Sequence, residues 1–384
     1  MSTTIRNSSL QPDSVPRGDR VVVSGIKPTG TPHLGNLVGM LRPVARMRGG
    51  GDRFCFVADL HALTTRRDAA ELRDAVYDAV ATLLALGLDP VRVTTFRQSD
   101  VPEILELSWI LGTLAPMPFM ERAHACKAAR AEGRTATLGL VSYPVLMAAD
   151  ILSFRGEIVP AGSDQAQHVE MARTLARRFN HRFGGDLPLP RALHEKGARS
   201  ELPGLDGRKM SKQYRNTIPI TATPEKRRAL VRTIVTDSSP VDAPKNPEAS
   251  PVTAIFDAFA TPEESANLRQ ALRDGRADWG EAKDALIHVL DRELEPIRER
   301  FHSLRSNEQG LEAVLLDGGR TARQRAAATL RGVRSLTGIG PVQHAPVRRP
   351  AAAYASGLLD RALEMTFPAS DPVAIATPQT RREE

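Results

Sequence analysis

A glycine-bearing turn near the N-terminus places polar residues between a β-branched run and an apolar-periodic helix. The turn spans residues 24–36 and reads Ser-Gly-Ile-Lys-Pro-Thr-Gly-Thr-Pro-His-Leu-Gly-Asn. A helix that begins directly after a strand presents free backbone N–H groups and the positive end of its dipole, which together attract anions. The turn fits neither the Walker A pattern nor G-x-G-x-x-G. It is therefore either an anion site of another kind or an ordinary connection between strand and helix.

A second polar segment, far downstream, carries two lysines three residues apart on a loop with a glycine hinge. Residues 205–213 read Leu-Asp-Gly-Arg-Lys-Met-Ser-Lys-Gln, which includes Lys209 and Lys212. Two ammonium groups on such a loop can close over a triphosphate and stabilise the charge that develops on a leaving pyrophosphate. A basic loop on its own is more often a solvated surface. Its combination with the turn that contains His33 and Asn36 favours triphosphate chemistry.

The segments around these residues predict a parallel α/β fold. Short β-branched runs alternate with longer helical patterns, which is typical of a parallel sheet covered by helices. Strands are expected at 21–24, 54–58, 91–96 and 157–159, and helices at 37–48, 69–86, 101–114, 144–152 and 165–179. Asp100 and Glu103 predict a capping box for the helix at 101–114. We expect a Rossmann-like catalytic domain over residues 20–218.

Beyond residue 218 the strand signals nearly disappear and the pattern becomes helical. Thr223 before Pro224, and a capping box of Thr261 and Glu264, mark helix starts. An apolar stripe predicts a long core-facing helix, which Pro296 should kink or split. The stripe consists of Leu290, Leu294, Ile297, Phe301 and Leu304. We expect an α-helical domain over 219–345, a disordered tail over 1–19 and a largely polar extension over 346–384.

Composition limits the class of protein. The chain has 384 residues, 41% hydrophobic and 25% charged, and no apolar run approaches the length of a membrane helix. Cys55 and Cys126 lack the spacing of a zinc site or a disulfide framework, so no bound metal is expected and a reducing cytoplasm is the simplest location. A net charge of +7 is compatible with a polyanionic partner, or with codon composition alone.

The two polar segments resemble the signatures of the class I aminoacyl-tRNA synthetases. That family carries His-Ile-Gly-His after the first strand and Lys-Met-Ser-Lys-Ser at the end of the nucleotide fold. Here His33-Leu34-Gly35-Asn36 and Lys209-Met210-Ser211-Lys212-Gln213 stand in the same order. Five other stretches narrow the resemblance to tryptophanyl-tRNA synthetases: 24–30, 58–64, 98–102, 143–152 and 159–168. The similarity covers roughly residues 20–340.

This resemblance implies an ATP site on the turn and the loop, with Mg²⁺ on the phosphates. The implied catalytic residues are His33, Asn36, Lys209 and Lys212. The implied ATP-binding residues are Lys27, Pro28, Thr29, Gly35, Asn36, Gly162, Ser163, Asp164, Leu202, Lys209, Met210, Ser211, Lys212 and Gln213. Lys27, Ser163 and Gln213 depart from the family pattern, which often has glutamine, aspartate and serine there. These departures concern the details of nucleotide contact rather than the reaction.

The same resemblance implies a tryptophan site. Its residues are Asp150, Tyr143, Met147, Gln165 and His61. Asp150 stands in an otherwise apolar segment, where an unpaired carboxylate is costly, and a carboxylate supplies the acceptor that an indole N–H requires. The alternative for Asp150 is an ion pair with Arg155. Tyr143 and Met147, four residues apart on one helix face, would be core residues if taken alone.

The implied reaction has two steps. The tryptophan carboxylate attacks the ATP α-phosphate to give tryptophanyl-adenylate and pyrophosphate, and a terminal ribose hydroxyl of tRNA(Trp) then takes the acyl group. The protein would act by positioning and charge stabilisation. The resemblance also implies a homodimer and a helical domain that reads single-stranded anticodon bases, with no membrane partner. Basic candidates for RNA contact are Arg227, Arg228, Arg232, Lys283 and Arg298.

Three alternatives stay open at this point. A tyrosyl-tRNA synthetase is a close structural relative, although Asp150 and the segment from Tyr143 to Met147 favour tryptophan. A paralogue could bind tRNA or tryptophan as a regulator, but retention of Lys209 and Lys212 argues against this. A second, inhibitor-tolerant copy of the synthetase is also compatible with the substitutions near the pocket.

Overall fold

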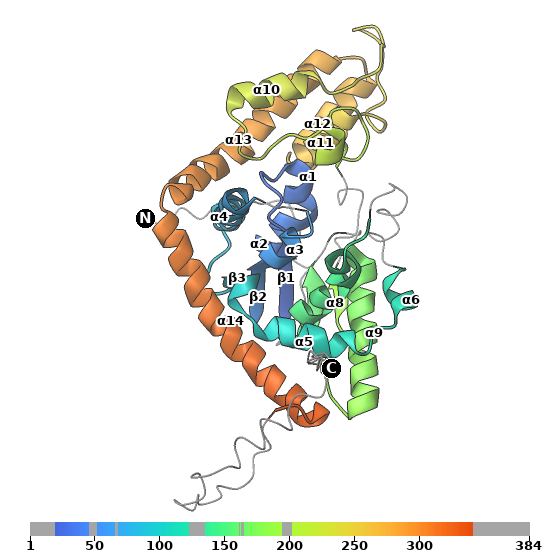
Figure 1. The fold of residues 1–384 in the computed structure, drawn as a ribbon. Coiled ribbons are helices and arrows are strands. Elements are labelled where there is room, and N and C mark those ends of the chain that lie inside the picture. Colours follow the sequence, from blue (N-terminus) through green and yellow to red (C-terminus); the bar gives the residue numbers. More distant parts are fainter. Residues whose placement is uncertain are drawn as a thin grey trace, which may run out of the picture. The chain divides into compact units, whose positions relative to one another are not determined.

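The computed structural model of the chain describes residues 20–45, 52–65, 68–122, 135–160, 162, 165–193 and 202–340 (Figure 1). Residues 1–339 group into one compact unit that holds every element described below, and residues 340–384 form a second unit, of which only Gly340 is described. The expected tails at 1–19 and 346–384, together with Ser163, Asp164 and Cys126, lie outside the described residues.

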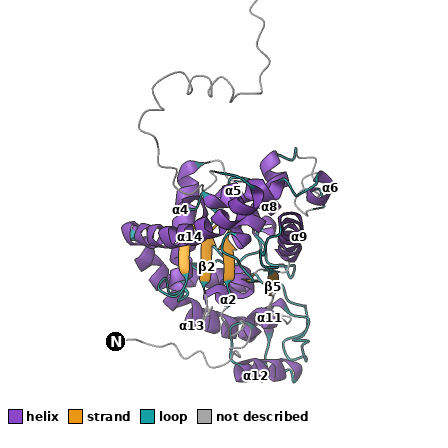
Figure 2. Cartoon of the chain, turned by 90° about the horizontal axis from the view of Figure 1, so that it is seen from below, coloured by secondary structure: helices purple, strands orange, loops and turns teal. Residues whose placement is uncertain are grey.

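A five-stranded parallel sheet with the strand order β3-β2-β1-β4-β5 forms the centre of this unit. Figure 2 shows its strands in orange among the surrounding helices. The strands are β1 (Val22–Ile26), β2 (Arg53–Val57), β3 (Thr94–Arg97), β4 (Ile158–Pro160) and β5 (Arg191–Leu193). The chain builds outward from β1 to β3 and then crosses to β4 on the other side of β1, which creates a topological switch point. The predicted parallel α/β class is confirmed. Sequence analysis missed β5, a strand of only three residues without a buried side chain.

Both faces of the sheet are buried. Successive strand side chains point to opposite sides, so each strand contributes to two cores. One core contains Val22, Ile26, Cys55 and Val57. The other contains Val21, Val23, Phe54 and Phe56. The first core is shared with α4 (Ala69–Ala85) and with α13 (Trp279–Arg305). The second is shared with α5 (Glu103–Gly112), α8 (Leu138–Leu152) and α9 (Ala166–Phe183).

Several short helical segments follow strand ends or connect the longer helices. They are α1 (Leu34–Asn36), the π-helical η1 (Leu37–Leu41), α2 (Arg42–Ala45), α3 (Asp59–Ala62), the 3-10 helix η2 (Gln98–Asp100), α6 (Met117–Met120) and the 3-10 helix η4 (Lys212–Tyr214). The predicted capping box of Asp100 and Glu103 is wrong. Asp100 lies within η2 and accepts from the Arg97 guanidinium, and α5 begins after Pro102 without a side-chain cap.

The C-terminal part of the unit is helical. Its helices are α10 (Pro224–Arg232), α11 (Pro251–Asp257), α12 (Pro262–Arg273), α13 and α14 (Glu308–Thr337). The predicted Thr223 cap and the capping box of Thr261 and Glu264 are confirmed. Pro296 does not split α13: the apolar stripe on both sides of the proline is buried, and its packing holds the helix together. Among the helices of the described ranges, none is long and apolar enough to cross a membrane.

The last helix returns to the sheet. α14 packs against the edge strand β3, as Figure 1 shows, and approaches it backbone to backbone. A Cβ at Gly318 would lie 1.8 Å from the Thr95 carbonyl oxygen, so a larger residue cannot occupy this position without displacing the helix. Glu312 on the same helix accepts a hydrogen bond from Arg97 at 2.6 Å. The C-terminal end of β3 is thereby fixed from outside the sheet.

Candidate active site

The described candidate residues gather at the carboxyl ends of the strands and on α8. The turn with Lys27 follows β1, α3 with His61 follows β2, and Gly162 and Gln165 follow β4. The lysine loop, residues 205–213, joins this edge from a distant part of the chain. Shortly after the loop, the backbone carbonyl of Ile218 accepts a hydrogen bond from the backbone N–H of Leu34 at 3.0 Å. In open α/β sheets this edge is where ligands bind.

The turn is held by hydrogen bonds within itself and to its surroundings. The His33 backbone N–H donates to Asn36 Oδ1 at 3.1 Å, and Lys27 Nζ donates to Thr64 Oγ1 at 3.1 Å. Pro28 is buried, whereas Thr29 is exposed. Asn36, which was predicted as a catalytic and ATP-binding residue, thus also holds the backbone at His33.

His33 is an uncharged imidazole at neutral pH. Its side chain is only 6% exposed, and burial, followed by the charge of Lys212, lowers its pKa from 6.5 to about 4. Gly35 lies directly beneath it, where a Cβ would stand 3.1 Å from the imidazole ring. The small residue in the His33-Leu34-Gly35-Asn36 turn thus leaves space for the ring that precedes it.

The lysine loop has buried anchors and exposed charges. Leu202 and Met210 are both buried, and the Met210 N–H donates to the Leu202 carbonyl at 2.8 Å. These two predicted ATP-binding residues therefore anchor the loop in the core. Lys209, Lys212 and Gln213 are exposed, and Ser211 Oγ accepts the Gln213 N–H. Lys212 Nζ donates to the Thr29 carbonyl at 3.1 Å, which joins the loop to the turn.

Asn216 organises this loop and was missed by sequence analysis. Its buried amide accepts the Ser211 N–H at 2.8 Å and donates to Asp206 Oδ1 at 2.6 Å and to the Lys209 carbonyl at 3.1 Å. Gly204 leaves room for it, since a Cβ there would lie 2.2 Å from Asn216 Nδ2. A single asparagine after a polar loop gives no signal in one sequence that it holds the loop together.

Asp150 forms the centre of a buried polar group. Its side chain has no exposed surface; Oδ1 accepts from Gln98 Nε2 at 2.7 Å and Oδ2 bonds His61 Nε2 at 2.8 Å. A carboxylate oxygen only accepts, so His61 Nε2 carries the hydrogen. The alternative ion pair with Arg155 is wrong, because Arg155 instead binds Asp186 at 3.0 Å.

The remaining predicted tryptophan residues lie next to this group. Tyr143 precedes Asp150 by two turns of α8, and its ring lies edge-on to His61 with centroids 6.1 Å apart. The Tyr143 hydroxyl forms a hydrogen bond with Nε2 of His168. Nδ1 of the same imidazole contacts Gln165 Oε1 at 3.1 Å. Met147 is partly buried on the same helix. Gln98 and His168 are the two members that were not predicted; both lie in stretches that carried the family resemblance.

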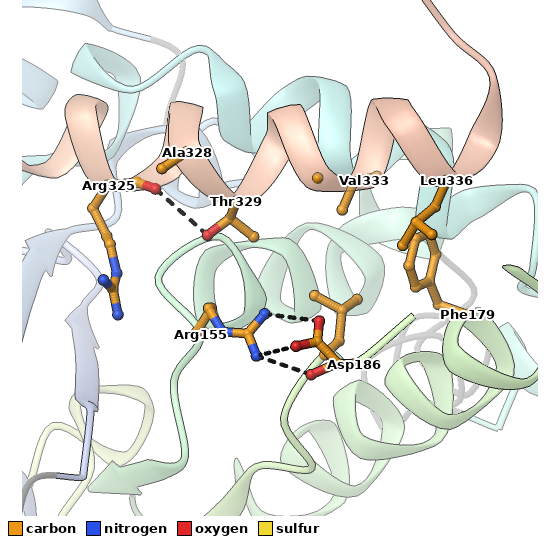
Figure 3. A pocket seen from close by; sticks show the side chains of 10 residues that line it. Arg155, Phe179, Asp186, Arg325, Ala328, Thr329, Val333 and Leu336 are labelled. Atoms are coloured by element: carbon orange, nitrogen blue, oxygen red, sulfur yellow. Dashed lines mark hydrogen bonds and ion pairs between the residues drawn. The ribbon is translucent and has the colours of Figure 1, made fainter. Parts of the chain in front are cut away.

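A hollow on the opposite edge of the sheet is distinct from this site. It has a volume of about 210 Å³ and lies between α9, the C-terminal half of α14 and the loops that contain Arg155 and Asp186 (Figure 3). Its lining includes Arg155, Phe179, Asp186, Arg325, Thr329 and Leu336. None of the predicted site residues belongs to it, and the Arg155–Asp186 ion pair in the figure closes part of its wall.

Known proteins are similar to this chain in both sequence and fold. A family model of the class I tRNA synthetases (W and Y) matches residues 16–295. The tryptophan–tRNA ligase of Xanthomonas axonopodis is 47% identical over 320 residues, which cover 80% of this chain and 74% of that protein. The tryptophan–tRNA ligase of Rhodopirellula baltica is 43% identical over 319 residues, which cover 83% of this chain and 99% of that protein.

Solved structures agree with this assignment. Tryptophanyl-tRNA synthetase from Campylobacter jejuni, complexed with ADP and tryptophan, has a TM-score of 0.75 and 34% identity, and the match covers 83% of this chain and all of that chain. Tyrosyl-tRNA synthetase from Archaeoglobus fulgidus has a TM-score of 0.59 at 20% identity, over 73% of this chain and 90% of that chain, a likeness of fold alone. On the family model and the sequence relatives together, the chain belongs to the class I tRNA synthetases of the tryptophan and tyrosine group.

Proposed function

We propose that this chain is a tryptophan–tRNA ligase, which activates L-tryptophan with ATP and transfers it to tRNA(Trp). The contact that carries the proposal is the bond from Lys212 to Thr29, which joins the lysine loop to the turn. The turn is also connected to the Asp150 group through His61. Lys27 donates to Thr64, and the Thr64 hydroxyl donates to the carbonyl of His61. A nucleotide site and an amino-acid site then share one edge of the sheet. The names of the sequence relatives support tryptophan as the amino acid, whereas the tyrosyl enzyme supports only the fold.

In the proposed ATP site the protein acts by charge and position. Lys209 and Lys212 carry positive charge to the triphosphate, and the neutral His33 lies beside Lys212 without adding to the charge. These groups stabilise the negative charge that develops as pyrophosphate leaves. Lys27, Gly162 and Gln213 would supply further contacts to the nucleotide.

Mg²⁺ would enter this site on the phosphates of ATP. In the part of the chain that the structure describes, no group of three His, Cys, Asp or Glu side chains is able to hold a metal ion. We therefore propose that the phosphates of the nucleotide supply most of the ligands of the ion. When bound, the ion neutralises phosphate charge.

In the proposed tryptophan site Asp150 accepts the indole N–H. Each carboxylate oxygen has two lone pairs, so an oxygen that already accepts from Gln98 or His61 retains capacity for one more donor. Tyr143, Met147 and Gln165 would complete the pocket around the amino acid. A substrate without a donor would leave the carboxylate short of a partner, which is a strong basis for discrimination.

Pyrophosphate exchange with tryptophan and with tyrosine tests the proposed function. We expect ATP-dependent exchange with tryptophan and exchange with tyrosine weaker by at least about 100-fold, which is the discrimination that even a hydrophobic pocket achieves. Stronger exchange with tyrosine than with tryptophan would mean that the amino-acid substrate is tyrosine. Exchange with neither amino acid by a folded protein that binds tryptophan would instead favour a regulator.

We infer that the helical region from residue 219 binds tRNA in the second step. Arg227 is fully buried between Asp291 and Glu295 and is therefore structural. Arg232 pairs with Asp284 and Arg298 with Glu295, while Lys283 donates to the Arg232 carbonyl. Arg228 is exposed on α10 and is the best placed of the five candidates.

Salt dependence tests this division between the two steps. Phosphate contacts release counterions, so raising the salt concentration should weaken tRNA binding steeply while tryptophan activation responds little. Filter binding and pyrophosphate exchange, measured over one salt series, make the comparison. Equal sensitivity of both steps would contradict it.

We place this reaction in the cytoplasm, where ATP and tRNA meet the translation machinery.

We also propose that the enzyme is a homodimer. Four exposed apolar side chains lie on α5, α6 and α8, helices that pack against one another: Leu105, Trp109 (77% exposed), Met117 and Leu138 (80% exposed). Apolar surface of this kind marks an interaction site. Trp109→Glu should yield monomers in analytical ultracentrifugation, whereas Val241→Glu, at another exposed apolar position, should not. A monomeric unmodified protein at micromolar concentration would refute the proposal.

A further inference from the structure

Gln98 is a buried amide whose two ends are both committed to the tryptophan site. Its side chain has no exposed surface. Nε2 donates to Asp150 Oδ1 at 2.7 Å, and Oε1 accepts the His61 backbone N–H at 3.3 Å. His61 in turn bonds the other oxygen of Asp150 through Nε2. Gln98, His61 and Asp150 therefore form a closed set of hydrogen bonds in which each partner fixes the next.

The backbone that carries Gln98 is itself held on two sides. The next residue, Ser99, donates its backbone N–H to Asp59 Oδ1 at 3.0 Å and its hydroxyl to Asp59 Oδ2, which ties η2 to α3. On the other side, Arg97 binds Asp100 and Glu312 of α14. An amide presented from so fixed a segment keeps one position and one orientation.

This arrangement has a consequence for the direction of the Asp150 carboxylate. With one oxygen on Gln98 and the other on His61, the plane of the carboxylate is set before any ligand arrives. A buried polar group held by oriented donors loses little freedom when a further donor binds, so the binding energy of that donor is retained. Removal of the Gln98 amide would leave one oxygen buried without its donor.

We propose that Gln98 is a positioning residue for amino-acid selection: it orients the Asp150 carboxylate toward the indole N–H and thereby contributes to the preference for tryptophan. The proposal rests on the tryptophan–tRNA ligase function given above. It assigns to Gln98 no contact with ATP and no part in the transfer to tRNA.

The first test uses Gln98→Met, which keeps a similar side-chain length but removes both hydrogen bonds. We expect KM for tryptophan in pyrophosphate exchange to rise about tenfold or more, as for loss of a hydrogen bond to a charged group, while KM for ATP and kcat change less than about threefold. A benzothiophene analogue of tryptophan, in which sulfur replaces the indole N–H, reports the carboxylate contact directly. The preference for tryptophan over this analogue should shrink.

The matched control is Gln270→Met. Gln270 also donates through Nε2 to an aspartate, Asp274 at 2.7 Å, but on the exposed surface of α12. Its KM values should equal those of the unmodified enzyme. Equal tryptophan KM in a folded Gln98→Met variant would overturn the proposal while the proposed function stands. Absence of tryptophan-dependent exchange in the unmodified enzyme would instead overturn the proposed function.

A second variant, Gln98→Glu, separates positioning from mere packing. It keeps the shape of the side chain but sets a second carboxyl against Asp150, so the two must share a proton. Protonated, the introduced carboxyl can donate as the amide does. KM for tryptophan in this variant should therefore fall as the pH is lowered from about 8 to about 6, because the pair of carboxyls raises the pKa of the introduced group.

The other charged and titratable groups near this pair are present in the unmodified enzyme as well. They are His61, Asp59, Arg97, Asp100 and Glu312. Division of the variant's pH profile by that of the unmodified enzyme removes their contribution. A ratio that is flat between about pH 6 and about pH 8 would show that the Gln98 amide fills space only, and would overturn the proposal.

Discussion

The amino-acid side and the nucleotide side of the site are built in opposite ways. Asp150 and Gln98 are fully buried, and their hydrogen bonds are already made among side chains of the pocket. Lys209 and Lys212 are exposed, and the loop that carries them is held mainly through its backbone by Asn216. In the proposed function, choice of substrate thus depends on groups fixed in the core, and charge stabilisation on groups that remain at the surface.

This contrast has a thermodynamic reason. A buried carboxylate without partners is costly, so the pocket has to satisfy Asp150 with donors such as Gln98 and His61. The lysine ammonium groups are exposed, so Lys212 can exchange its bond to the Thr29 carbonyl for one to a triphosphate when it arrives. Changes in the pocket should therefore alter affinity and selection, whereas changes in the loop should alter the rate of activation.

The largest effect is expected for Lys212→Ala. Loss of a charge that acts as pyrophosphate departs should slow adenylate formation by about 100- to 1000-fold, while tryptophan affinity stays within about twofold. Single-turnover activation and equilibrium binding of tryptophan measure the two quantities. Lys283→Ala is a matched control, since that ammonium also donates to a backbone carbonyl, at 3.0 Å. An unchanged activation rate, or a loss confined to tryptophan affinity, would contradict the proposed role of the loop.

Asp150→Ala should act on selection. It removes the acceptor for the indole N–H. The activation free energy obtained from kcat/KM for tryptophan should therefore rise by about 1.5 to 3 kcal/mol, while activity with phenylalanine changes little. Pyrophosphate exchange with both amino acids measures this, after circular dichroism confirms folding. Asp186→Ala, which removes an exposed carboxylate, is the control. Parallel losses for both amino acids would identify Asp150 as a structural residue.

His33 brings burial to the nucleotide side, because its buried imidazole lies beside the exposed Lys212. Its lowered pKa, from 6.5 to about 4, means that the unfolded chain takes up the proton more readily. The stabilisation is complete above pH 6.5 and is lost as the pH falls toward 4. From pH 7 to pH 5 the native protein should lose about 2 kcal/mol more unfolding free energy than His33→Asn does.

Lys212→Ala sharpens this measurement. Burial is the larger cause of the lowered His33 pKa and the Lys212 charge the smaller. The pH-dependent loss should therefore shrink in Lys212→Ala but persist. Denaturant titrations at the two pH values measure it. The same loss in His33→Asn as in the unmodified protein would show that His33 is not the titrating group.

The sequence predicted those parts of the molecule that local patterns determine. Alternation of strands and helices predicted the sheet, and the turn and the lysine loop, both selected from the sequence, meet at one edge of it. It failed where distant segments decide the outcome. Asp100 could cap α5 by spacing alone, but Arg97 takes its carboxylate. Pro296 by itself should kink or split a helix, but α13 is not split, because its apolar side chains on both sides of the proline are buried in the core.

The support of the site was equally hidden in the sequence. Asp150 drew attention because a carboxylate interrupts an apolar helix, whereas its donor Gln98 lies 52 positions away and belongs to another strand end. Asn216 lies near the lysine loop, but only the folded structure shows three of its hydrogen bonds converging there. Residue types therefore indicated the groups that act, and the tertiary structure was needed to find those that hold them.

Asn216→Ala should have the smallest effect and joins both halves of the comparison, since a buried side chain positions an exposed loop. Loss of its bonds to Ser211, Asp206 and Lys209 frees the loop without removing either lysine charge, so adenylate formation should slow by about three- to tenfold, the equivalent of about one hydrogen bond. KM for ATP should rise with it, and KM for tryptophan should stay constant. Asn246→Ala, at an exposed turn where the side chain accepts a backbone N–H, is the control. An increase in the tryptophan KM instead would mean that the pocket and the loop are not separate devices.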